Sequence, residues 1–218
     1  IYFNWTRQHL NTNVLLSPQI QKQLQKHTYS WAITGVAGFI GSHLLETLLQ
    51  YNQNVIGIDN FATSGHTNFE FVQQQLTPEQ WQNFTFIESD ICNTEQYEEH
   101  FAAVDFVLHH AALGSVPQSI KDPMQFNKTN VEGFLHILEI CKKHNIKRIT
   151  YASSSAIYGD NNNPQQLEDS YTKPLSPYAV NKLANDLYAQ VYHRCYQLPI
   201  VGFRYFNIFG PRQSPNGA

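Results

Sequence analysis

Tyr178 and Lys182 stand four residues apart toward the end of the chain. If this stretch is helical, the spacing places the phenol and the ammonium one turn apart on the same face. The positive charge would favour the phenolate and bring the tyrosine pKa toward working pH, as general base catalysis requires. In a chain with 12 tyrosines such a pair also arises by chance, so this chemistry needs supporting residues.

Three consecutive serines, Ser153, Ser154 and Ser155, provide that support. They follow a short apolar run at 148–152 that is typical of a buried parallel strand. In open parallel sheets, ligand contacts gather at the carboxyl ends of the strands. A serine hydroxyl at this edge can hold a substrate hydroxyl beside the tyrosine.

Three glycines with the spacing G-x-x-G-x-x-G, Gly35, Gly38 and Gly41, join the first expected strand to the first expected helix. This spacing permits a tight turn, close approach of a pyrophosphate, and close packing of helix on strand, with the helix N-terminus aimed at the phosphates. Asp59 ends the second strand 18 residues beyond Gly41, where a carboxylate binds ribose hydroxyls and repels a 2′-phosphate. The pattern predicts NAD rather than NADP. A structural turn with an unrelated capping aspartate is the alternative.

Two further strand ends contain candidate cofactor contacts. Asp90 and Ile91 follow the third expected strand, where an adenine contact is expected, although Asp90 is equally suited to cap the next helix. His110 and the two alanines after it close the fourth strand, and small residues there suit the close approach of a dinucleotide. Because the neighbouring His109 must face the opposite side of the strand, the two histidines do not form one site. We expect no bound metal.

The elements that position these residues follow from hydrophobic patterning. From residue 30 to residue 218, short apolar runs alternate with longer amphipathic stretches, which predicts an α/β domain with a doubly wound parallel sheet. We expect strands at 31–34, 54–58, 84–88, 105–109, 148–152 and 200–204, and helices at 41–50, 94–101, 123–144 and 177–196. Residues 1–29 form an N-terminal arm in which 18–26 could make two turns of helix, packed on the main domain or on a second subunit.

Composition limits the classes of partner. The chain has 218 residues, 14 Lys and Arg against 17 Asp and Glu, a formal charge of -3 and 42% hydrophobic residues, as expected for one large domain. The absence of long basic runs argues against nucleic acid and membrane surfaces as partners. We expect a cytoplasmic protein, because the sequence has no spanning-length apolar run and no apolar signal block in its first 30 residues. Cys92, Cys141 and Cys195 are expected to be buried or half-buried free thiols.

Five segments of the sequence are distinctive enough to indicate a protein family, and we call them the five specific strings. They are Gly35-Val36-Ala37-Gly38-Phe39-Ile40-Gly41, Asp59-Asn60-Phe61-Ala62-Thr63, Ala111-Ala112-Leu113-Gly114-Ser115-Val116-Pro117, Ser176-Pro177-Tyr178-Ala179-Val180 and Arg204-Tyr205-Phe206-Asn207. Through them the chain resembles, from Trp31 to Ala218, the extended short-chain dehydrogenase/reductase family of nucleotide-sugar epimerases and dehydratases. Within the family it looks most like the UDP-N-acetylglucosamine 4-epimerases of bacterial polysaccharide synthesis. The resemblance implies a Rossmann fold, NAD as cofactor and a UDP-sugar as substrate.

The resemblance also implies roles for individual residues: Tyr178 as general base, Lys182 as its support and nicotinamide-ribose ligand, and Ser154 as the serine of the catalytic triad. The expected cofactor contacts are Gly35, Gly38, Phe39, Ile40, Gly41, Asp59, Asn60, Asp90, Ile91, His110, Ala111, Ala112, Tyr178 and Lys182. The expected substrate contacts are Gly114, Ser115, Ser154, Ser155, Tyr178 and Asn207.

The reaction that the resemblance implies is 4-epimerisation, in which a sugar 4-hydroxyl is oxidised to a ketone and reduced on its other face. Sister 4,6-dehydratases have an Asp-Glu pair directly after the triad hydroxyl, whereas this chain has Ser155 and Ala156. The alternatives are another nucleotide-sugar oxidoreductase or dehydratase of the family, and an inactive NAD-binding fragment. A net oxidoreductase would release NADH in step with substrate.

A homodimer is a further implication, with the helices at 123–144 and 177–196 forming a four-helix bundle across a two-fold axis. The apolar candidates for this contact are Leu135, Ile137, Leu138, Leu183, Leu187 and Val191. The alternative is that these side chains face their own sheet. Family members continue beyond Ala218, so we expect the smaller C-terminal substrate domain to be missing or truncated, with apolar surface exposed and solubility reduced.

Overall fold

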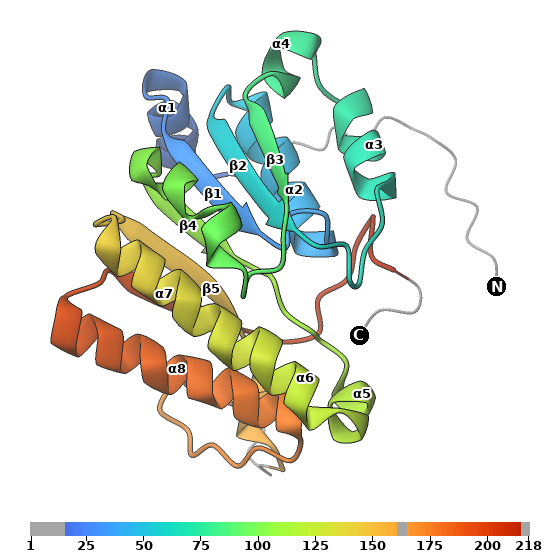
Figure 1. Cartoon of the computed structure of the whole chain (residues 1–218), viewed down its shortest axis with the longest axis vertical. Coiled ribbons are helices and arrows are strands. Elements are labelled where there is room, and N and C mark those ends of the chain that lie inside the picture. Colours follow the sequence, from blue (N-terminus) through green and yellow to red (C-terminus); the bar gives the residue numbers. More distant parts are fainter. Residues whose placement is uncertain (1–15, 161–164, 215–218) are drawn as a thin grey trace.

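The computed structural model describes residues 16–160 and 165–214 and shows a three-layer α/β fold (Figure 1). Within these residues, six parallel strands form one sheet in the order β3-β2-β1-β4-β5-β6. The strands are β1 Ser30–Thr34, β2 Asn54–Asp59, β3 Phe84–Glu88, β4 Phe106–His109, β5 Arg148–Ser154 and β6 Ile200–Tyr205. The order reverses between β1 and β4, which is the switch point where such sheets bind dinucleotides. The Rossmann sheet and its six expected strands are confirmed.

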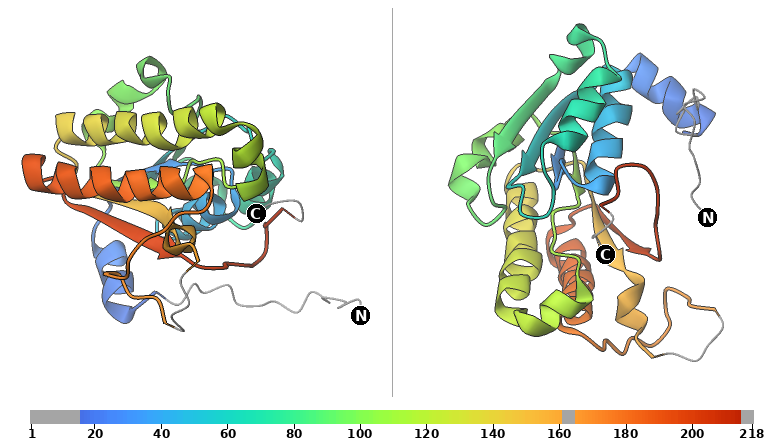
Figure 2. Two further views of the ribbon diagram at one scale, coloured as in Figure 1. Left: turned by 90° about the horizontal axis from the view of Figure 1, so that it is seen from below. Right: turned by 90° about the vertical axis from the view of Figure 1, so that its right-hand side faces the viewer.

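Helices cover both faces of the sheet, as Figure 2 shows. They are α1 Pro18–Lys26, α2 Phe39–Gln50, α3 Thr67–Gln74, α4 Pro78–Trp81, α5 Val116–Lys121, α6 Pro123–Asn127, α7 Gly133–Lys143 and α8 Pro177–Tyr196. Helix α2 packs on β1 and β2, whereas α7 and α8 lie side by side on the other face. Each face has its own core, with Leu45 and Leu49 in one and Phe134 and Leu138 in the other. Among the described residues, no helix combines the length and apolarity of a membrane span.

The helix predicted at 94–101 is wrong. Two 3₁₀ turns occupy this segment, η1 Thr94–Gln96 and η2 Glu98–Ala103. Tyr97 separates them with φ -139° and ψ -11°, outside the α-helical region. Its ring is fully buried and its hydroxyl donates a hydrogen bond to Ile91 O, which holds the residue in this conformation. The short helices α3, α4 and α5 have no predicted counterpart.

The described part of the N-terminal arm packs on the main domain. Its helix α1 buries Leu24, and the fully buried side chain of Gln53 fastens it. The Gln53 amide Nε2 donates to Leu24 O at 3.0 Å and to His27 O at 3.1 Å, while Oε1 accepts from Tyr29 N at 2.9 Å. A buried amide that is satisfied at both its nitrogen and its oxygen fixes the geometry of its neighbours. The sequence left open whether the arm packs on the main domain or on a second subunit. Residues 16–29 pack on the main domain.

Two of the six apolar positions considered for a dimer contact are buried in the protein's own core. Ile137 and Leu138 have no exposed surface, because they face the sheet from α7. Leu187 and Val191 on α8 are exposed, and the remaining two candidates are half-buried. Of these six, Leu187 and Val191 are thus the ones that are exposed to solvent.

The three cysteines are free thiols. Cys141 is buried and Cys92 half-buried, as expected. The expectation is wrong for Cys195, which is exposed. It lies in the last turn of α8, where residues 193–197 are all exposed.

Candidate cofactor and catalytic site

The glycine loop between β1 and α2 brings the backbone of two strand ends into contact. Gly35 has φ +70°, and a Cβ there would lie 2.6 Å from Ala111 N at the end of β4. A Cβ on Gly41 would collide with Gly35 O. Gly38 is the N-cap of α2 and has no side chain to occupy the free N–H groups of the first turn. The loop and helix terminus therefore form an open cradle suited to phosphate.

An acidic edge borders this cradle at the ends of β2 and β3. Asp59 is buried, and its Oδ2 and Oδ1 accept hydrogen bonds from Ala37 N at 2.9 Å and Phe61 N at 2.8 Å. Burial raises the pKa of Asp59, while these backbone hydrogen bonds oppose the rise. Asn60 Nδ2 donates to Asp90 Oδ2 at 2.9 Å, which links the two strand ends. Each oxygen of Asp59 keeps a lone pair for a further donor such as a ribose hydroxyl.

A cleft runs along the cradle and the acidic edge. The predicted cofactor residues that line it are Gly35, Gly38, Asp59, Asn60, Asp90, Ile91, His110, Ala111 and Ala112. Five predicted cofactor contacts do not line it: Phe39, Ile40 and Gly41 lie in the first turn of α2, at the end of the cradle, and Tyr178 and Lys182 lie on α8. Residues of the cleft wall that we did not predict as contacts are Ala62, Thr63, Ser89, Leu113, Gln125 and Thr129. Ala62 and Thr63 belong to one of the five specific strings, which was the available signal for them.

The two histidines at the end of β4 face opposite sides, as predicted. His109 lies in the core with Nδ1 2.8 Å from Thr34 Oγ1. His110 lines the cleft, stacks on Tyr205, and has a buried Nδ1 without a hydrogen-bond partner among the described residues. Burial, helped by the charge of Lys182, lowers the pKa of His110 to about 4. A neutral ring with an unpaired nitrogen in the cleft, beside a cradle that a Cβ would fill, fits a bound dinucleotide.

Ser154, Tyr178 and Lys182 come together at the end of β5. Helix α8 starts as expected, with Ser176 as N-cap and a proline at its first position, and the tyrosine and lysine lie one turn apart on it. The Tyr178 side chain is hydrogen-bonded to Ser154. Lys182 is 4% exposed, its Nζ donates to Ala152 O at 2.8 Å, and it lies 5.9 Å from the centre of the Tyr178 ring.

Burial controls the charge of this group. It lowers the pKa of Lys182 to about 8, although the carboxylate of Asp186 acts in the opposite direction. Burial also raises the pKa of Tyr178, and the hydrogen bond with Ser154 opposes that rise. The phenol therefore needs added positive charge nearby before it can act as a base near neutral pH.

Asn130 is a site residue that the sequence analysis missed. It lies in the π-turn η3 Lys128–Glu132, which interrupts the helix predicted at 123–144 and separates α6 from α7. Its Oδ1 accepts from Leu113 N at 2.8 Å and its Nδ2 donates to Leu113 O at 3.0 Å. This pairing holds the loop after β4 against the cleft. The available signal was a polar residue within the stretch predicted to be helical. Turns of the π type often occur at functional sites.

The predicted substrate residues lie at the carboxyl ends of three neighbouring strands. Gly114 is exposed and Ser115 is the N-cap of α5, accepting from Gln118 N. Ser155 begins the 3₁₀ turn η4 Ser155–Tyr158 directly after β5, and Asn207 is exposed just beyond β6. They share the sheet edge that contains Ser154.

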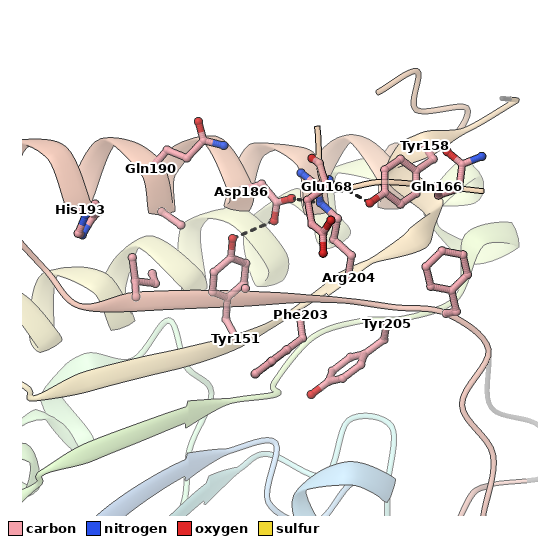
Figure 3. Close-up of a pocket in the computed structure, with 14 residues that line it drawn as sticks. Tyr151, Tyr158, Gln166, Glu168, Asp186, Gln190, His193, Phe203, Arg204 and Tyr205 are labelled. Carbon is pink, nitrogen blue, oxygen red and sulfur yellow. Dashed lines mark hydrogen bonds and ion pairs between the residues drawn. The ribbon is translucent and has the colours of Figure 1, made fainter. Parts of the chain in front are cut away.

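Figure 3 shows a second cavity, of about 540 Å³, between α8 and the strands β5 and β6. It is lined by a network of hydrogen bonds centred on Asp186 and Arg204. None of the predicted site residues lines it. In the described part of the chain, no three or more His, Cys, Asp or Glu side chains form a cluster suited to a metal.

Together, the fold and the cleft at its switch point define a dinucleotide-binding protein of the Rossmann class with a Ser-Tyr-Lys group at its edge. Residues 31–218 match the sequence model of the NAD dependent epimerase/dehydratase family. The chain belongs to that family, whose cofactor is NAD.

Several relatives are described as UDP-sugar epimerases, and one solved relative, from Streptomyces venezuelae, is a dTDP-glucose 4,6-dehydratase that is 32% identical with a TM-score of 0.78, over 85% of this chain and 58% of that one. A UDP-N-acetylglucosamine 4-epimerase from Methanobrevibacter ruminantium, solved with UDP-N-acetylmuramic acid, is 37% identical with a TM-score of 0.79, over 88% of this chain and 60% of that one. A Bacillus cereus UDP-glucuronic acid 4-epimerase, solved with UDP-glucuronic acid and NAD, is 36% identical with a TM-score of 0.77, over 86% and 59%. Protein CapI of Staphylococcus aureus is 36% identical over 85% of this chain and 56% of its own. The chain thus spans less than two thirds of the length of these relatives.

Proposed function

We propose that the full-length protein is an NAD-dependent 4-epimerase of a UDP-N-acetylhexosamine, with its uronic acid form as the second candidate. The observation that carries the proposal is the placement of Ser154, Tyr178 and Lys182 beside a cleft suited to NAD. The names of the relatives support the reaction class, and they differ in the sugar. A role in cell-surface polysaccharide synthesis in the cytoplasm belongs to the same proposal.

The residues of the chain supply the proton chemistry. Ser154 holds the sugar 4-hydroxyl, and the Tyr178 phenolate removes its proton as the C4–H bond breaks. Bound NAD supplies the hydride acceptor at C4 and, in its reduced form, the donor that restores the C–H bond. As the C–H bond re-forms on the other face of C4, the phenol of Tyr178 returns the proton to the ketone oxygen. Lys182 stabilises the phenolate that is present before the first proton transfer and after the second. Substrate and product differ only in configuration at C4, and no net oxidation occurs.

A dehydratase is the less suitable reaction for these residues. Elimination needs an acid and a base at neighbouring carbons, and Ser155 and Ala156 occupy the positions directly after the triad serine. Neither side chain is a proton carrier at neutral pH. A net oxidoreductase would use the same triad, so the release of NADH is what separates it from an epimerase.

We also propose a homodimer through α6, α7 and α8. Its support is an apolar stripe along α8 formed by Val180, Leu187, Tyr188 and Val191, all more than a third exposed. Residues at these spacings share one helix face. An exposed apolar stripe of this kind suits a helix-on-helix contact between copies.

The test is to incubate the full-length protein with UDP-N-acetylglucosamine, separate the products, and follow NADH absorbance in the same tube. Appearance of UDP-N-acetylgalactosamine without accumulating NADH supports the proposal. NADH in proportion to substrate would move the assignment to a dehydrogenase. If no UDP-hexose were turned over, the epimerase proposal would fail and only the NAD site would remain.

A further inference from the structure

We propose that the ion pair between Asp186 and Arg204 tunes the protonation of Lys182 and thereby sets the basicity of Tyr178, with Asp186 favouring the charged lysine and Arg204 limiting that effect. The inference rests on the proposed function, since it concerns the general base of that reaction. Both members of the pair are positioning residues, because they act on the substrate through Lys182 and Tyr178.

Asp186 lies one helical turn beyond Lys182 on α8, so the two side chains share a face of the helix. It is 5% exposed. Its Oδ2 accepts from Arg204 Nε at 3.0 Å and its Oδ1 accepts from Tyr151 Oη at 2.9 Å. Figure 3 shows these partners converging on the carboxylate from β5 and β6. With both oxygens engaged, the carboxylate stays fixed relative to the lysine.

Arg204 is held from its other side as well. Its Nη1 donates to Tyr158 Oη at 3.0 Å and to Glu168 O at 2.7 Å, and its guanidinium lies 5.2 Å from the centre of the Tyr158 ring. Its side chain is 20% exposed. These contacts prevent the guanidinium from turning out to solvent, so its charge remains part of the field around α8.

Burial has the largest effect on the pKa of Lys182, and Asp186 is the charged neighbour that opposes it. The titratable and charged groups that face the lysine, directly or through Asp186, are Tyr178 and Asp186 on α8, His109 and His110 on β4, Tyr151 on β5 and Arg204 on β6. The two histidines are neutral near pH 7, because burial lowers the pKa of both. Asp186 counteracts the burial that lowers the pKa of Lys182, and Arg204 moderates that negative charge.

Breaking the pair from its two ends therefore has opposite effects. Asp186→Asn removes the negative charge and leaves the positive Arg204 behind, so Lys182 loses its proton more easily and stabilises the Tyr178 phenolate less. Arg204→Gln leaves the carboxylate uncompensated, so Lys182 holds its proton more firmly and the phenolate is favoured. A purely structural role would impair both variants without shifting their titrations in opposite directions.

The test titrates the Tyr178 phenolate by ultraviolet absorbance in the full-length protein with NAD bound, as the difference between each variant and the same variant with Tyr178→Phe. We expect the midpoint to rise by about one pH unit in Asp186→Asn and to fall by about one unit in Arg204→Gln. The pH profile of kcat/KM should move the same way on its acid side. Arg204→Lys keeps the charge, and Tyr151→Phe removes only a hydrogen bond, so both are matched controls with midpoints near wild type.

Shifts in the same direction, or no shift in either variant, would overturn the proposal. The titration needs no substrate, so it remains decisive if the protein proves not to be an epimerase. If Asp186→Asn fails to fold, the comparison of Arg204→Gln with Arg204→Lys decides the question alone. Equal midpoints for those two variants would then contradict the role of the pair.

Discussion

Replacing Gly35 by alanine tests whether the cradle depends on contact between two backbones. The residue has φ +70°, and an added Cβ would lie 2.6 Å from Ala111 N and 2.8 Å from the carbonyl carbon of His110. A left-handed conformation costs a residue with a Cβ about 1–2 kcal/mol. Overpacking costs about 1–3 kcal/mol more, because backbone atoms on this side cannot rotate away. Gly35→Ala should therefore lower the free energy of unfolding by about 2–5 kcal/mol.

The chain offers a matched control in Gly65, where an added Cβ meets nothing within 4 Å. Both variants would be compared by denaturant unfolding and by the NAD that stays bound after gel filtration. Gly35→Ala should lose stability and NAD, since the end of β4 must move away from the cleft, whereas Gly65→Ala should keep both. If the two variants unfolded at the same denaturant concentration and retained equal NAD, the geometry argued for the cradle would be refuted.

Three other changes test separate contacts. Arg212→Ala breaks a 2.7 Å ion pair with Glu46 in which the side chains are 5% and 10% exposed. It should lower the free energy of unfolding, measured by denaturant titration, by about 3–5 kcal/mol. A loss below about 1 kcal/mol would contradict the pairing. Asn130→Ala removes both hydrogen bonds to Leu113 and should lower the free energy of unfolding by about 1–3 kcal/mol. It should also weaken NAD binding measured by calorimetry. An unchanged affinity for NAD would argue against the role of Asn130 at the cleft. Burial lowers the pKa of Lys182 to about 8, so the folded state binds fewer protons than the unfolded chain between pH 8 and the ordinary lysine value. Relative to Lys182→Met, wild-type stability should therefore rise by about 3 kcal/mol across that range, and a flat difference in pH-dependent unfolding would contradict the burial.

The sequence predicted the strands well because a buried parallel strand is a short apolar run with its own recognisable composition. The candidate residues at strand ends followed from the same reasoning, since Asp59, His110 and the three serines at 153–155 each come directly after such a run. The family resemblance singled out Ser154 among the three. Local pattern also placed the start of α8, where Ser176 and the next proline define the cap.

What could not be predicted depends on contacts distant in sequence. Tyr97 interrupts a helix because its ring is buried in the core, and Asn130 belongs to the site because its amide pairs with a loop after another strand. The link between Asp186 and Arg204 forms only when α8 packs beside β6. No local propensity encodes these pairings, because each needs the assembled sheet to bring its partners within hydrogen-bonding distance.

The most direct test of the central claim uses UDP-N-acetylglucosamine deuterated at C4 with the full-length protein, followed by mass spectrometry of the separated products. The account predicts UDP-N-acetylgalactosamine that keeps the deuterium at C4, no accumulating NADH, and loss of the reaction in Tyr178→Phe. Deuterium lost from C4, or a Tyr178→Phe variant as active as wild type, would contradict it.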